Sequence, residues 1–297
     1  MHYYTIIGCF TILSLGSIGG CQSKTSTTTT TTVTPNTTTT TASADIEIPI
    51  FKAYQPIGQQ VKHTYYTLFY NNANEQADWV AYKLTKTMVN SKNAQRLDNF
   101  REDPAVTDQS ANPNDYRGSG YDRGHLCPAA DMKTNENAMS ETFFMSNMSP
   151  QEHAMNTGCW NNLEDRVRDF ARWSKEIYVV TGPILYNQTF SKKIGKTTKV
   201  VVPNLYYKAI LDYTEPDIKA IGFVMENKGS EAATETFAIS IDELEQKTGI
   251  DFFSTLPDNV ENKIEASFNY ADWLVGDDDS DERSKAAGGR KNRKNRK

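Results

Sequence analysis

Two residues close together in the sequence have the chemistry needed to cut a phosphodiester bond. His125 and Arg123 lie in the segment Tyr-Asp-Arg-Gly-His, which has the composition of a strand. Strand alternation would place both side chains on one face. An imidazole can take a proton from water while a guanidinium holds anionic oxygens. A single histidine is more often an ordinary surface or core residue, but the neighbouring arginine favours phosphodiester chemistry.

A second group of candidate residues lies on a helix expected over residues 154–173. Asn156 and Glu164 fall along one side of it, together with Trp160 and Leu163. The two polar residues would be about 12 Å apart along the axis, so both cannot easily be direct ligands of one ion. One can bind Mg²⁺ directly and the other through a water molecule. Taken alone, the helix favours a simpler interpretation, in which Asn156 is a polar N-terminal residue and Glu164 faces solvent.

Three motifs that contain these residues resemble the signature of the DNA/RNA non-specific endonucleases, the ββα-metal nucleases. Their order and spacing match that family, and the resemblance covers nearly all of residues 60–260. The motifs are Asp122-Arg123-Gly124-His125-Leu126-Cys127-Pro128-Ala129-Ala130-Asp131-Met132, Ser146-Asn147-Met148-Ser149-Pro150-Gln151 and Asn156-Thr157-Gly158-Cys159-Trp160-Asn161-Asn162-Leu163-Glu164.

The resemblance implies a role for each matching residue and a metal cofactor, Mg²⁺, which Mn²⁺ can replace. In these roles His125 is the general base, Asn156 the direct metal ligand, Glu164 the anchor of a metal-bound water, Arg123 a phosphate contact and Asn147 a support of the site. A further family arginine matches either Arg96 or Arg101. The implied reaction is hydrolysis of DNA and RNA, in which neutral His125 activates water and the products carry 5′-phosphates.

Strand-like segments outnumber helical ones in the expected folded domain, residues 45–275. Strands are expected at residues 46–48, 64–70, 79–84, 177–180, 199–202, 206–211 and 220–225, and helices at 154–173 and 242–247. Strands and helices do not alternate, so the sequence predicts an α+β fold with a mainly antiparallel central sheet flanked by helices. The resemblance implies the ββα-metal nuclease fold. The long polar stretch at residues 91–120 is expected to be a functional loop.

Cys127 and Cys159 are the cysteines expected to remain in the domain after export. If the nearby His125 and Asn156 share a metal site, the two sulfur atoms lie close together. An oxidising compartment then favours a disulfide over two free buried thiols. A zinc site that includes His125 is disfavoured, because it would consume the base.

The N-terminal residues resemble a bacterial lipoprotein signal. A short apolar run at residues 6–18 leads into Ile-Gly-Gly-Cys, which predicts a signal peptide over residues 1–20 and a lipidated Cys21. An ordinary cleaved signal with an incidental cysteine is the alternative. Either signal exports the protein, and the lipid would anchor it to a membrane facing the periplasm or the cell exterior. Thr-rich residues 22–44 are then a tether.

Composition and charge narrow the remaining possibilities. The 297 residues are 38% hydrophobic and carry a formal charge of −5, which excludes a wholly disordered chain and a generally basic surface. Residues 276–297 are acidic and then basic, and are expected to form a disordered tail. The basic end leaves one alternative, a surface lipoprotein that binds extracellular nucleic acid without cutting it. The intact set of His125, Asn156 and Glu164 favours the enzyme.

Overall fold

The computed structural model of the protein describes residues 45–274. The expected signal peptide (residues 1–20), Cys21, the Thr-rich tether (22–44) and the tail (276–297) lie outside the described residues. Within residues 45–274, no helix has both the length and the apolar character needed to cross a membrane.

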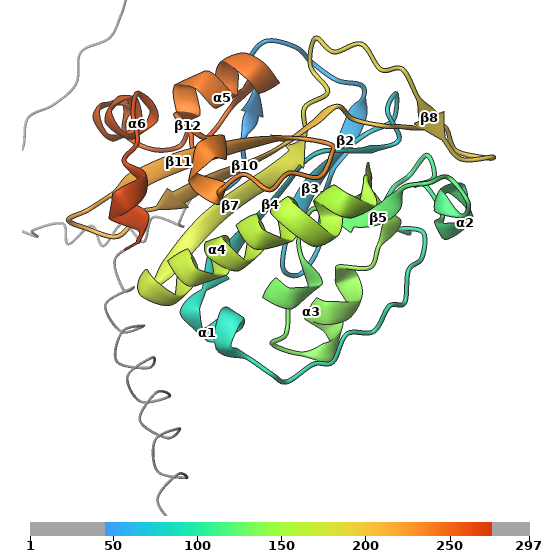
Figure 1. The fold of residues 1–297 in the computed structure, drawn as a ribbon, viewed down its shortest axis with the longest axis horizontal. Coiled ribbons are helices and arrows are strands. Elements are labelled where there is room, and N and C mark those ends of the chain that lie inside the picture. Colours follow the sequence, from blue (N-terminus) through green and yellow to red (C-terminus); the bar gives the residue numbers. More distant parts are fainter. Residues whose placement is uncertain (1–44, 275–297) are drawn as a thin grey trace, which may run out of the picture. The chain divides into compact units, whose positions relative to one another are not determined.

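A central antiparallel sheet organises the described part of the chain (Figure 1). Its seven strands follow the order β12-β11-β10-β7-β4-β3-β2. Their bounds are β2 Gly58–Lys62, β3 Thr67–Asn71, β4 Gln76–Thr85, β7 Glu176–Pro183, β10 Leu205–Asp212, β11 Lys219–Glu226 and β12 Ala238–Ile239. Three pairs of short strands accompany the sheet: β1 Ile50–Phe51 with β13 Ile250–Asp251, β5 Asp122–His125 with β6 Met148–Gln151, and β8 Lys193–Ile194 with β9 Val200–Val201.

The helices lie mostly in the connections between strands. The α-helices of residues 45–274 are α1 Lys86–Asn90, α2 Pro113–Tyr116, α3 Glu136–Glu141, α4 Trp160–Trp173, α5 Ile241–Thr248 and α6 Asp258–Glu265. The predicted α+β class and the antiparallel sheet are confirmed. One expected strand is wrong, because Ile46 and Glu47 form a turn and the first strand begins at Ile50.

Helix α4 covers one face of the sheet through an apolar stripe (Figure 1). Trp160, Leu163, Val167 and Phe170 are each at most 1% exposed, as the helical periodicity predicts. They belong to the same buried cluster as residues of the sheet such as Tyr206 of β10. This packing fixes α4, and the residues that lead into it, against a rigid sheet.

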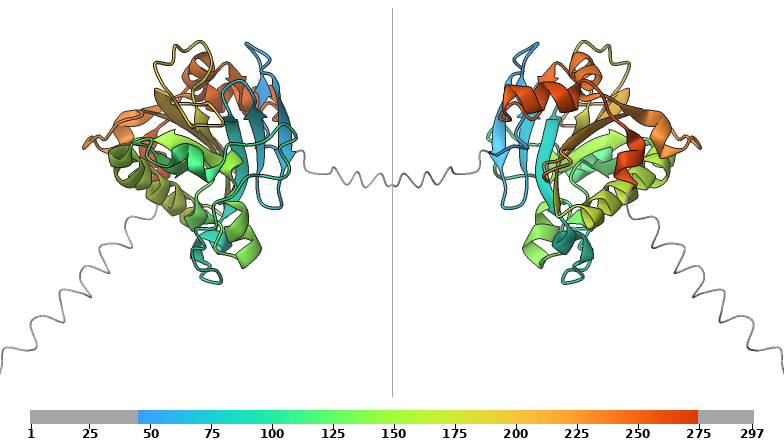
Figure 2. Two further views of the ribbon diagram at one scale, coloured as in Figure 1. Left: turned by 90° about the vertical axis from the view of Figure 1, so that its right-hand side faces the viewer. Right: turned by 90° about the vertical axis from the view of Figure 1, so that its left-hand side faces the viewer.

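The second face of the sheet is covered by α5 and α6. Ile241 and Leu244 of α5 and Ile264 of α6 are buried in one cluster with Tyr207 and Ala209 of β10. Neighbouring residues of a strand point to opposite faces, so β10 serves both layers. The two views in Figure 2 show the sheet between these helical layers.

The strand pair β5-β6 leads directly into α4 and forms the ββα unit. His125 pairs with Met148 and Asp122 with Gln151. The helix expected over residues 154–173 is not continuous, however. Residues Met155–Cys159 form a π-helical turn in which Gly158 has φ −108° and ψ −111°, and α4 begins only at Trp160. Glycine has no Cβ, so it tolerates this break, which reorients the turn that carries Asn156.

Candidate active site

Strand β5 presents His125 and Arg123 on the same face, as strand alternation predicts. Both side chains contact Phe100, which lies in the long polar loop. The Arg123 guanidinium carbon is 4.0 Å from the centre of the Phe100 ring, and the His125 ring centre is 5.8 Å from it. The functional role expected for that loop therefore has a structural basis, because the loop supplies a platform for the two side chains.

The imidazole of His125 is held between two aromatic rings, and the residue as a whole is half-buried. The Phe143 ring meets it edge-on, with centres 5.1 Å apart and planes at 89°. Its Nε2 atom is buried and has no hydrogen-bond partner. Burial, together with the positive charges of Arg96 and Arg123, lowers the pKa of His125 to about 3. The ring is therefore neutral at physiological pH and free to accept a proton, which a general base requires.

The structure distinguishes between the two arginines that the sequence left open. The Arg96 guanidinium lies 5.0 Å from the centre of the Phe143 ring and is one of the charges that act on His125. Arg101 instead donates to the carbonyl oxygens of Asn99 and Ser140, at 3.1 and 3.0 Å. Arg96 therefore belongs to the site, whereas Arg101 fastens the loop to the end of α3.

Replacing Arg96 with alanine is expected to lower kcat/KM about 10- to 100-fold, the cost of one charged hydrogen bond to phosphate. It should also raise the pKa of His125, because a nearby positive charge is removed. The acid limb of the kcat/KM profile should therefore move to higher pH. Arg101→Ala is the matched control and should leave that limb in place. An unmoved limb in Arg96→Ala would contradict the electrostatic role.

Asn156 offers one free oxygen, and the reason is a hydrogen bond that the sequence analysis missed. Its Nδ2 atom donates to Oδ2 of Asp122, at 2.9 Å, which turns Oδ1 away from that carboxylate. The same Oδ2 atom lies 2.8 Å from Nδ1 of His153. An amide oxygen is a suitable ligand for a hard cation. Asp122 stands in the motif with Arg123 and His125, so its position was visible in the sequence, but its role was not.

Glu164, in the second turn of α4, is half-buried among buried charges. Burial raises the pKa of this carboxyl to about 7, and Asp131 adds to the rise, whereas Lys208 and Arg168 oppose it. A bound cation would favour the ionised form. The half-buried position and these neighbouring charges argue against the simple alternative in which Glu164 is a solvated residue of the helix face.

Lys208 is the residue of this charged group that no pattern in the sequence indicates. It lies on β10 and is fully buried, with Nζ 3.2 Å from Oγ1 of Thr181 and 4.8 Å from the centre of the Trp160 ring. Burial lowers the pKa of Lys208 below its usual value, and the negative charge of the nearby Glu164 opposes part of this shift. The lysine links the central sheet to α4 below the site. Such a residue cannot be recognised within an apolar strand pattern, because its partners come from segments that are distant in the sequence.

Asn147 supports the site without facing it. Its Nδ2 atom donates to the carbonyl oxygens of Cys127 and Thr142, both at 2.9 Å, and its Oδ1 atom accepts from the Cys127 amide at 2.8 Å. The side chain is fully buried. All its hydrogen-bonding groups except one lone pair are thus used, two of the three bonds by Cys127 just after His125 and the third by Thr142 at the end of α3. Asn147 is a positioning residue.

Asn147→Ala should lower the free energy of unfolding by about 3 kcal/mol, because it leaves buried backbone groups of Cys127 and Thr142 unpaired. Urea denaturation of both proteins measures the difference. The matched control is Asn137→Ala, since Asn137 is exposed and its side chain bonds only to Glu141. The control should change stability by less than about 0.5 kcal/mol. Equal stabilities of Asn147→Ala and the wild type would rule out the supporting role.

The predicted disulfide between Cys127 and Cys159 is wrong for this structure, which has both as free, buried thiols. The Cys159 sulfur lies 3.8 Å from the carbonyl oxygen of Lys228, which its thiol can approach as a donor. The prediction assumed that residues near a shared metal site carry adjacent sulfurs. Cys159 instead follows the break at Gly158, and Cys127 lies close to the buried charges of Asp131 and Lys208.

Two hollows border the candidate site and carry positive side chains. One, of about 230 Å³, is lined by Arg117, Asp122 and Arg123, among others. The second, of about 270 Å³, is lined in part by Lys192 and Lys228. Tyr121 contributes to both. Each hollow has two basic residues and one acidic residue in its lining, Asp122 in the first and Glu226, which pairs with Lys228, in the second, so each has an excess of positive charge that suits an anionic polymer.

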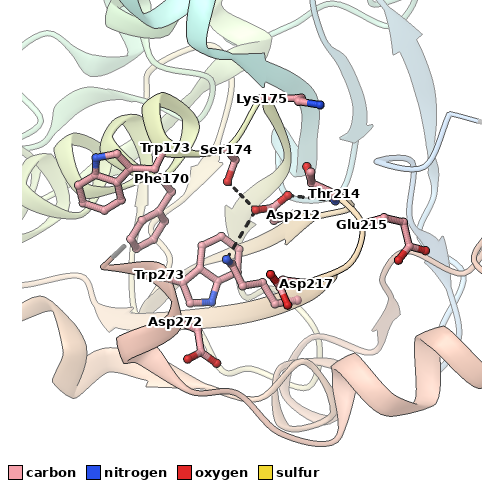
Figure 3. Close-up of a pocket in the computed structure, with 11 residues that line it drawn as sticks. Phe170, Trp173, Ser174, Lys175, Asp212, Thr214, Glu215, Asp217, Asp272 and Trp273 are labelled. Atoms are coloured by element: carbon pink, nitrogen blue, oxygen red, sulfur yellow. Dashed lines mark hydrogen bonds and ion pairs between the residues drawn. The ribbon is translucent and has the colours of Figure 1, made fainter. Parts of the chain in front are cut away.

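A further cavity, of about 300 Å³, lies away from the candidate site (Figure 3). Phe170 and Trp173 at the C-terminal end of α4 line it together with Asp212. Asn156 lies before α4 and Glu164 lies in its second turn, toward the other end of the helix. Asp212 already accepts a hydrogen bond from Ser174 and pairs with Lys219. This cavity is therefore separate from the candidate active site.

The fold and the site together define a class of enzyme. A strand pair that carries His125, followed by a helix with Asn156 in the turn before its start, is the arrangement of the ββα-metal fold. The sequence profile of the DNA/RNA non-specific endonucleases matches residues 45–259. The chain belongs to this family, whose members are metal-dependent nucleases.

Individual relatives agree with this assignment. A nuclease of Nostoc sp. is 35% identical over 213 residues, which cover 68% of this chain and 75% of the relative. The mitochondrial nuclease EXOG of Danio rerio is 35% identical over 207 residues, which cover 65% of this chain but only 60% of EXOG. Among solved structures, a chain of the EndoG/EndoGI complex superposes with a TM-score of 0.63 and 28% identity, covering 69% of this chain and 89% of that chain.

Proposed function

We propose that the protein is an exported, membrane-anchored endonuclease that uses Mg²⁺ to hydrolyse DNA and RNA, leaving 5′-phosphate ends. One observation carries the catalytic part of the proposal. A neutral, half-buried His125 lies beside Arg96 and Arg123, and Asn156 is turned so that its oxygen is free. Each of these groups matches one requirement of phosphodiester hydrolysis.

In the proposed reaction His125 takes a proton from the attacking water. The ring is neutral at physiological pH, and the negative charge of a phosphate bound by the two arginines would raise its pKa toward the working range of a general base. Arg123 and Arg96 hold the non-bridging phosphate oxygens and favour the negative charge that develops on them. Phe100 and Phe143 fix the orientation of the ring and limit the access of bulk water.

The residues present fit a hard divalent cation. Asn156 would bind it directly through Oδ1, and Glu164 would hold it through water. When bound, Mg²⁺ supplies positive charge at the phosphate and an acidic water close to the leaving 3′ oxygen. Asp122 keeps the Asn156 amide in the orientation that binding requires.

Substrate tolerance follows from the kind of group that lines the site. Arginine and lysine side chains contact phosphates, which are the same for every base and for both sugars. The candidate contacts are Arg96, Arg117, Arg123, Lys192 and Lys228. We therefore propose that the enzyme reads the backbone and cuts without sequence preference.

An assay of the full-length protein tests the proposal. Supercoiled plasmid and a long RNA are each incubated with the enzyme in Mg²⁺, in Mn²⁺ and in EDTA. Both substrates should be degraded with either metal and remain intact in EDTA. Binding of both nucleic acids without cleavage in Mg²⁺ would instead support a non-catalytic surface lipoprotein.

Export and anchoring rest on the N-terminal sequence, where residues 6–18 lead to Cys21. Expression of the full chain in bacteria that are fed a labelled fatty acid tests this part. The wild type should take up label and fractionate with membranes. Cys21→Ser should do neither. A soluble, unlabelled wild type would overturn the anchor but leave the nuclease proposal intact.

A further inference from the structure

Three carboxylates come together on the face of the sheet opposite α4. Asp242 and Glu245 lie on α5, and Glu265 ends α6 (Figure 1). One oxygen of each residue lies within 4.8 Å of the other two. The cluster has no part in the nuclease site, because α5 and α6 belong to the second layer of the fold. Carboxylates this close together repel one another, so the cluster requires an explanation.

Glu265 is the unusual member of the cluster. The residue is only 6% exposed, and its Oε1 atom is buried without a hydrogen-bond partner. Burial of an unpaired carboxylate is costly, and folded proteins avoid it unless a proton or a cation neutralises the charge. The same carboxyl group brings one oxygen to within 4.8 Å of an oxygen of each of the other two residues. A buried carboxyl group with an unpartnered oxygen, close to two other carboxylates, has the geometry expected of a cation ligand.

The surroundings of the cluster add negative charge. Asp251 and Glu261 also lie close enough to act on Glu265, and burial with these neighbours raises its pKa to about 8. The cation that the structure places here, Lys52, is 63% exposed and lies 3.5 Å from Glu245 and 3.7 Å from Asp251. It forms no ion pair with Glu265 among the described contacts. Lys52 thus pairs with two of the five carboxylates, Glu245 and Asp251.

We propose that Asp242, Glu245 and Glu265 bind a calcium ion that fastens α5 to α6. Calcium accepts six to eight oxygen ligands at about 2.3–2.6 Å, so ligands on opposite sides of the ion lie about 4.8 Å apart. The observed oxygen separations are within that span. Magnesium is smaller and usually takes one or two carboxylates with several waters. A cluster of three carboxylates thus matches calcium better.

The bound ion is structural. Both helices cover the second face of the sheet, so an ion that joins them should stabilise the folded state without entering the chemistry. Open, partly exposed sites of this kind bind calcium at about 0.1–1 mM, a range that suits an extracellular protein. At about 10 mM Ca²⁺, roughly 100-fold above the tighter limit, the melting temperature should rise by about 5 °C.

Calorimetry of the full-length protein, freed of metal and scanned with and without about 10 mM Ca²⁺, tests the proposal. Glu265→Gln and Asp242→Asn should lose the calcium-dependent shift. Asn156→Ala should keep it, since that variant alters only the nuclease site. The matched control Glu243→Gln, an exposed residue of α5 that pairs with Lys247, should also keep it.

The variants must fold for the test to be fair. Without calcium, Glu265→Gln should melt at or above the wild-type temperature, because the neutral amide relieves repulsion. If it does not fold, Asp242→Asn decides, since Asp242 is exposed. The proposal is overturned if calcium leaves the wild type unchanged, if Asp242→Asn responds like the wild type, or if the shift disappears in Asn156→Ala. An equal shift with Mg²⁺ would overturn the assignment to calcium.

Discussion

His125→Ala should lower kcat by at least about 100-fold and leave folding and nucleic-acid binding intact. The imidazole contributes to the step in which water loses its proton, and alanine has no group that can accept one. The ring sits between Phe100 and Phe143 at the end of β5, so its removal leaves the strand pair β5-β6 and its hydrogen bonds in place. The loss should therefore appear in the chemical step alone.

Single-turnover cleavage with excess enzyme measures that step, and a filter-binding assay in EDTA measures binding. His153→Ala is the matched control. It removes an imidazole from the same region, but this side chain is 76% exposed and contacts Asp122 rather than the site aromatics. Its loss should stay below about 10-fold. A cleavage rate for His125→Ala within threefold of the wild type would rule out the proposed base.

Asn156→Ala should lose more than about 100-fold in activity at a fixed, moderate Mg²⁺ concentration, and more than Glu164→Gln does. Asn156 is the proposed direct ligand, whereas Glu164 acts through water, and residues behind the direct ligands cost about 10- to 100-fold when changed. Saturating Mg²⁺ should restore Glu164→Gln more fully than Asn156→Ala. The order of the two variants is the informative result.

Activity measured against Mg²⁺ concentration gives the apparent metal affinity of each variant. Asp122→Asn provides a further comparison, because its amide can no longer accept from Asn156 with a full negative charge. The apparent Mg²⁺ affinity of Asp122→Asn should lie between those of Glu164→Gln and Asn156→Ala. An apparent affinity for Mg²⁺ that is the same in Asn156→Ala and the wild type would contradict the ligand assignment.

The sequence alone was sufficient to predict those structural features that a local residue pattern determines. His125 and Arg123 share a face because strands alternate, and the apolar stripe from Trp160 to Phe170 buries itself as helical periodicity requires. The antiparallel sheet followed from strand-like runs that lack intervening helices. These are short-range rules, and each depends on a few neighbouring residues.

The sequence was insufficient where distant segments meet. Arg96 and Arg101 lie in one loop, and only the contacts with Phe143 and with the end of α3 separate their roles. Likewise, the carboxylate of Asp122 finds Asn156 across the ββα unit. Because of the backbone break at Gly158, α4 begins later than expected. Cys159 therefore lies in the turn before α4 rather than within a continuous helix.

The most direct test of the catalytic account is hydrolysis of matched DNA and RNA strands by the full-length enzyme in Mg²⁺ and ¹⁸O-labelled water. Mass spectrometry then locates the label and identifies the ends. The account predicts that both strands yield 5′-phosphates that carry one ¹⁸O atom, because water activated at His125 attacks phosphorus. Unlabelled 2′,3′-cyclic phosphates from RNA, with DNA left intact, would contradict it, since the 2′-hydroxyl rather than water would then be the nucleophile.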